Sequence, residues 1–91
     1  MTVTTFEVLA QRIDARRRQA EMLLASASHD TMKVQLCLGL RDLDEASEWL
    51  HRNADARPVH LLLDLAAWRL NSVVQMLRTE AGDAEVSRQT L

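Results

Sequence analysis

Hydrophobic residues recur every three or four positions along most of the chain, which is the spacing of one face of an α-helix. In the first third of the chain this face comprises Phe6, Leu9, Ala10, Ile13, Ala20, Leu23, Leu24 and Ala27. Thr4 or Thr5 is suited to cap its start, because a hydroxyl can accept a hydrogen bond from a free backbone N–H. A polar cluster at residues 26–30 predicts a turn. We therefore expect a first helix over about residues 5–27.

The second apolar stripe predicts a helix over about residues 31–52. Its members are Met32, Leu36, Leu40, Leu43, Ala46 and Leu50. Asp30 or Thr31 is the expected cap, and the basic residues His51 and Arg52 suit the negative end of the helix dipole. Gly39 lies inside the stripe and leaves two interpretations open: it allows a close approach between helices, or it breaks the helix. The first is favoured, because the stripe continues past Gly39 in phase.

A third helix is expected over about residues 58–80. Pro58 suits a first helical turn, and the apolar stripe that follows includes Leu62, Leu63, Ala66, Leu70, Val73 and Leu77. Gly82 is the predicted stop. Residues 83–91 are polar, without a clear stripe, and are expected to form a tail.

Three helices of similar length joined by short turns predict an all-α domain over residues 1–82, an antiparallel up-down-up three-helix bundle. If the second turn centres near Ala54 and Asp55, Leu50 lies near Val59 and Leu43 lies near Ala66. Almost every apolar residue of the second helix then meets one of the third, which supports the pairing.

Composition narrows the class of protein. The chain has 91 residues, 47% of them hydrophobic but only 3% aromatic, with two Gly, one Pro and one Cys. This composition is untypical of intrinsically disordered, β-rich or disulfide-stapled proteins. The net charge of −2 gives no general attraction to nucleic acid or anionic membrane. No signal-like or membrane-spanning run is present, so a cytoplasmic location is expected, with Cys37 a buried thiol.

The second and third helices carry more apolar side chains than one face can hold. Leu38, Leu61, Leu65 and Trp68 are difficult to place together inside so small a bundle. Either they fill the core, or some form a surface for self-association or a partner protein. The second interpretation is favoured, and it predicts a homo-oligomer, most simply a dimer, or a complex with another protein.

Arg12 and the run at residues 16–18 form the single basic cluster. In an antiparallel bundle this cluster faces Asp42, Asp44, Glu45 and Glu48. We expect ion pairs, with Arg12, Arg16, Asp42 and Glu45 orienting a partner. A helix-turn-helix would instead require a break at Gly39, and its recognition helix would carry four carboxylates that repel DNA.

These features favour a small non-catalytic interaction module, such as an adaptor, regulator or chaperone-like subunit. No catalytic residue, cofactor or metal site is expected, because His29, His51 and His60 lack the spacing of a helical zinc site. Two alternatives stay open. One is a homo-oligomeric enzyme with an Arg-lined anion pocket, for which Arg17, Lys33 and Gln75 are candidates. The other is a nucleic-acid-associated regulator that uses Arg16 and Arg18.

Overall fold

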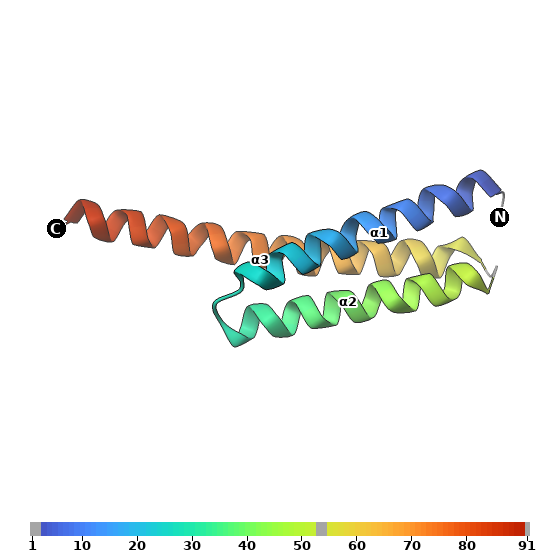
Figure 1. The fold of residues 1–91 in the computed structure, drawn as a ribbon, viewed down its shortest axis with the longest axis horizontal. Coiled ribbons are helices and arrows are strands. Elements are labelled where there is room, and N and C mark those ends of the chain that lie inside the picture. The colour runs from blue at the N-terminus through green and yellow to red at the C-terminus, as the bar shows by residue number, and fades with distance from the viewer. Residues whose placement is uncertain (1–2, 53–54, 91) are drawn as a thin grey trace.

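The protein folds into three α-helices that pack as a compact bundle (Figure 1). The computed structural model describes the backbone of residues 3–52 and 55–90, and side chains within 5–52 and 55–81. Helix α1 spans Val3–Ser26, α2 spans Asp30–His51 and α3 spans Ala56–Thr90. No strand occurs in the described ranges. The predicted all-α class and the three-helix bundle are confirmed.

Successive helices run in opposite directions, and α2 and α3 share the most extensive contact (Figure 1). The interior holds two apolar clusters that all three helices build. One consists of Leu9, Ile13, Leu43, Ala46, Leu50, Val59, Leu63 and Ala66. The other consists of Ala20, Met32, Leu36, Leu70 and Val73.

The first cluster joins residues that the sequence pattern paired across the second turn. It contains Leu50 with Val59, and Leu43 with Ala66. One member of the first predicted stripe departs from it, because Leu24 is exposed near the end of α1.

The helix ends differ from the prediction at several points. Helix α1 begins at Val3, so Thr4 and Thr5 lie within its first turn. The N-cap of α2 is His29, in extended conformation and without a side-chain capping bond, rather than Asp30 or Thr31. Asp30 instead lies in the first turn, where a carboxylate favours the positive end of the dipole.

Asp55 caps α3. Its carboxylate accepts the backbone N–H of Arg57 at 3.0 Å and the Arg57 Nε–H at 2.6 Å. These bonds lower the pKa of Asp55 from its ordinary value, first through the Arg57 side chain and then through the Arg57 backbone. Pro58 follows inside the first turn, as predicted.

The predicted stop at Gly82 is wrong, because α3 continues to Thr90 and has 35 residues, about 52 Å of helix. A glycine inside a helix costs about 1 kcal/mol and does not end it unless the chain turns away. The neighbouring sequence, rich in Ala, Glu, Arg and Gln, favours helix. α3 therefore extends beyond the turn between α1 and α2 (Figure 1).

The turn between α1 and α2 contacts α3 through Glu80, next to the point where α3 extends beyond the other two helices. Ser28 donates to both carboxylate oxygens of Glu80, at 3.1 and 3.0 Å. His29 Nε2 also contacts Glu80. Ser28 and His29 are thus both held against Glu80 of α3.

Two predictions about α2 have opposite outcomes. The helix passes through Gly39 without a break, and Gly39 is buried against α3. Cys37, expected to be buried, is exposed. The apolar run at residues 36–40 extends around more than one side of the helix, and Cys37 lies one residue, or about 100°, from the fully buried Leu36.

Candidate functional sites

Three large apolar side chains form an exposed strip on α3. Leu61, Leu65 and Trp68 are 69%, 38% and 61% exposed. Their spacing of four and then three residues places them on one helix face. These side chains lie outside both core clusters, so the surplus noted in the sequence is at the surface. We call these three residues the apolar strip.

The fourth predicted apolar contact, Leu38, is half-buried on α2. Gln35 and Asp42 flank it on that helix, and both hydrogen-bond to Arg69 of α3. Leu38 therefore lies at the level of Arg69, on the flank of α2 that meets α3. Leu38 is thus at the level of the last strip residue, Trp68, which precedes Arg69 in the chain, but on the neighbouring helix.

That boundary, which we call the α2–α3 seam, contains a largely buried ion pair. Arg69 Nε donates to Asp42 Oδ2 at 2.8 Å, and Arg69 Nη1 donates to Gln35 Oε1 at 3.3 Å. The two charged side chains are 19% and 12% exposed. Asp42, predicted to orient a partner or to face the basic cluster of α1, is instead engaged inside the fold. Sequence reasoning missed Arg69, whose partner is distant in the chain.

Of the ion pairs predicted between the basic cluster of α1 and the carboxylates of α2, the structure shows one among the residues it describes. Arg17 Nη1 lies 2.7 Å from Asp44 Oδ1, which joins α1 to α2 as expected of this cluster. Glu45 is exposed on α2. It lines a shallow hollow on α2 together with Arg41, Asp44 and Glu48.

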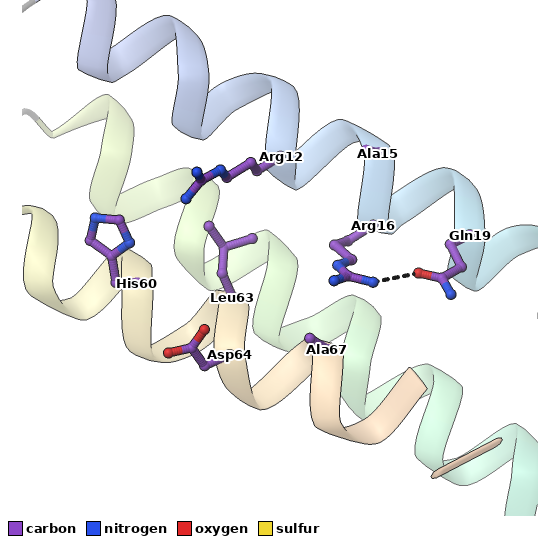
Figure 2. A pocket seen from close by; sticks show the side chains of 8 residues that line it. All are labelled: Arg12, Ala15, Arg16, Gln19, His60, Leu63, Asp64 and Ala67. Carbon is purple, nitrogen blue, oxygen red and sulfur yellow. Dashed lines mark hydrogen bonds between the residues drawn. The ribbon is translucent and has the colours of Figure 1, made fainter. Parts of the chain in front are cut away.

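A groove between α1 and α3, the α1–α3 groove, has a volume of about 430 Å³ (Figure 2). Arg12 and Arg16 line it from α1, and His60 and Asp64 line it from α3. Arg16 donates to Gln19 at 2.8 Å, whereas Arg12 extends toward α3 (Figure 2). Among the described residues, neither arginine forms an ion pair with a carboxylate. The small residues Ala15 and Ala67, together with Leu63, supply its apolar lining.

The residues of the alternative enzyme hypothesis are dispersed. Arg17 is paired with Asp44. Gln75 lines a different groove, beside His29, Met32 and Glu80. Lys33 is exposed on α2 and lines neither groove. The arginines that do share a groove are Arg12 and Arg16.

The histidines have separate environments. His51 ends α2, where its Nδ1 lies 2.7 Å from the Ser47 carbonyl oxygen and its ring packs edge-on against Phe6 at 5.8 Å.

Within the described part of the chain, no group of three His, Cys, Asp or Glu residues is arranged to hold a metal ion. Nor does that part contain a helix long and apolar enough to cross a membrane.

Comparison of the chain with protein-family models, with curated proteins and with solved structures finds no match.

Proposed function

We propose that this protein is a non-catalytic interaction module that binds a helix of a partner protein, or of a second copy of itself, on the apolar strip. The observation that supports this is the exposure of Leu61 and Trp68, 69% and 61%, on one face of a helix whose core face is already filled. Large apolar side chains gathered on a rigid helix are typical of helix-docking surfaces.

The charge beside the strip indicates the chemistry of the partner. Asp64 is exposed on the side of α3 that lines the α1–α3 groove. Glu45 is exposed on α2, where it lines a shallow hollow with Arg41 and Asp44 rather than the edge of the strip. A partner helix with a central apolar face and one Lys or Arg placed to pair with Asp64 complements this surface, and such a pair governs orientation and association rate.

The test compares a strip variant with a matched control. Leu61→Ser combined with Trp68→Ser removes two exposed anchors, whereas Met22→Ser removes a 73% exposed apolar side chain from α1. Because these sites are exposed, each substitution should change the free energy of unfolding by only about 0.5 kcal/mol. We expect the strip variant to lose self-association in light scattering, or to lose specific proteins captured from source-cell extract. The Met22→Ser control should keep them.

The proposal fails if the wild-type chain stays monomeric at high micromolar concentration and the strip variant captures the same proteins as wild type. It also fails if Met22→Ser abolishes association as completely as the strip variant does, because the binding would then not be specific to the strip.

A further inference from the structure

The positive charge of Arg12 and Arg16 is not neutralised by the fold. The two side chains lie one helical turn apart on α1 and line the same groove. Arg16 is held by the neutral amide of Gln19, and Arg12 forms no ion pair with any described residue. By contrast Arg17, adjacent in sequence, is paired with Asp44. Two guanidinium groups in an otherwise acidic protein are thus available to a ligand.

The opposite wall of the groove adds a weaker polar contribution. His60 and Asp64 lie one turn apart on α3 and line the groove on the side opposite α1 (Figure 2). Asp64 carries one negative charge, yet among the described residues it forms no ion pair with either guanidinium. Two cations opposite one carboxylate leave an excess of positive charge in the groove.

The apolar lining gives the groove a second kind of affinity. The side chains of Ala15 and Ala67 are small, and their size leaves the space above Leu63 open. The volume of about 430 Å³ lies within the range of about 300–1,000 Å³ for small-molecule sites, which combine apolar walls with a few polar groups. A ligand with a charged end and an apolar body matches both features.

We propose that the α1–α3 groove binds a small organic oxyanion, a carboxylate or phosphate compound, through Arg12 and Arg16. Guanidinium groups bind such oxyanions with paired, charge-assisted hydrogen bonds. The apolar body of the ligand lies on Ala15, Leu63 and Ala67. This site is separate from the apolar strip and does not depend on partner binding there.

Titration of the full chain with three probes, followed by backbone amide NMR shifts at constant ionic strength, tests the site. Acetate offers the charge alone, hexanoate adds an apolar tail, and inorganic phosphate offers a second oxyanion chemistry. Hexanoate should give saturable shifts at Ala15, Leu63 and Ala67. It should bind at least about tenfold more tightly than acetate, because its tail buries additional methylene groups.

Substitution identifies the residues responsible. Arg12→Gln and Arg16→Gln should each weaken hexanoate binding about tenfold, the cost of a lost charge-assisted hydrogen bond. Arg18→Gln is the matched control, since it removes the same charge from an exposed position on α1 outside the groove. It should change the affinity by no more than about twofold.

Three results would overturn the proposal. The first is linear, unsaturated shifts with all three probes. The second is an equal loss of binding in Arg18→Gln, which would show diffuse attraction to the basic cluster. The third is equal affinity for acetate and hexanoate, which would remove the role of the apolar lining. A stronger response to phosphate than to acetate would instead support the site and select phosphate compounds as its ligands.

Discussion

The α2–α3 seam and the α1–α3 groove show two outcomes for arginines placed opposite carboxylates. In the seam, Arg69 is 19% exposed and donates to Asp42 and Gln35. In the groove, Arg12 and Asp64 line the same space without pairing. Opposite charges on neighbouring helices are therefore not sufficient for an ion pair. The helices must also approach closely enough to bring the two groups together and exclude water.

Residue size accounts for much of this difference. At the seam Gly39 lies against Leu70 and Arg69, and the large core residue Leu70 is fully buried. In the groove, Ala15 and Ala67 leave open the space that larger side chains would fill. The seam therefore contributes mainly to stability, and the groove leaves room for a ligand.

The largest expected effect is a loss of stability, and it should differ between Leu70 and Leu63, two leucines on the same face of α3. Leu70→Ala should reduce the free energy of unfolding by about 3–5 kcal/mol, because Leu70 is fully enclosed and its removal leaves a cavity. Leu63→Ala should cost only about 2–3 kcal/mol, since water can enter from the groove. Urea unfolding measures both, and equal losses would contradict the distinction between seam and groove.

Breaking the ion pair of the seam should have the next largest effect. Asp42→Ala leaves Arg69 largely buried without its carboxylate, and we expect a loss of about 2 kcal/mol. Adding Arg69→Ala should recover part of that loss. Arg17→Ala is the control, because its pair with Asp44 is more exposed and should contribute less than about 1 kcal/mol. A similar cost for Asp42→Ala and Arg17→Ala would show that burial adds nothing to the pair.

Gly39→Ala should stabilise the protein by up to about 1 kcal/mol, because alanine has the higher helix propensity. The added Cβ would lie 3.8 Å from Leu70 Cδ2 and 3.9 Å from Arg69 Cβ, which is ordinary van der Waals contact. Thermal unfolding measures the change. A decrease in stability would mean that the seam is packed more closely than these distances indicate.

The smallest effect concerns the cap of α3, which belongs to neither the seam nor the groove. The pKa of Asp55 is lowered below its ordinary value of 3.8, so its ionised form stabilises the folded state. This contribution is present above about pH 4 and is lost as the pH falls through the folded-state pKa. Asp55→Asn keeps a capping oxygen but removes the charge, so its deficit relative to wild type should vanish in acid. A deficit independent of pH would contradict this origin.

Much of the fold was predictable because helix periodicity is a local property. The stripe that contains Leu36, Leu43 and Leu50 identifies the buried face of α2, and Pro58 identifies the start of α3. The excess of apolar residues on α3 also indicated side chains outside the core. The ends of the helices were harder to predict, since Gly82 is compatible with both a stop and a continuing helix.

The sequence by itself determined the three helices, their core faces and the presence of more apolar surface than the core can bury. Only the tertiary structure decided that Asp42 binds Arg69, that Cys37 is exposed, and that Arg12 and Arg16 share a groove with His60. The physical reason is that the backbone hydrogen bonds and the side-chain periodicity of a helix depend on residues that are close together in the sequence. The rotation and separation of neighbouring helices depend on the packing of residues distant in the chain.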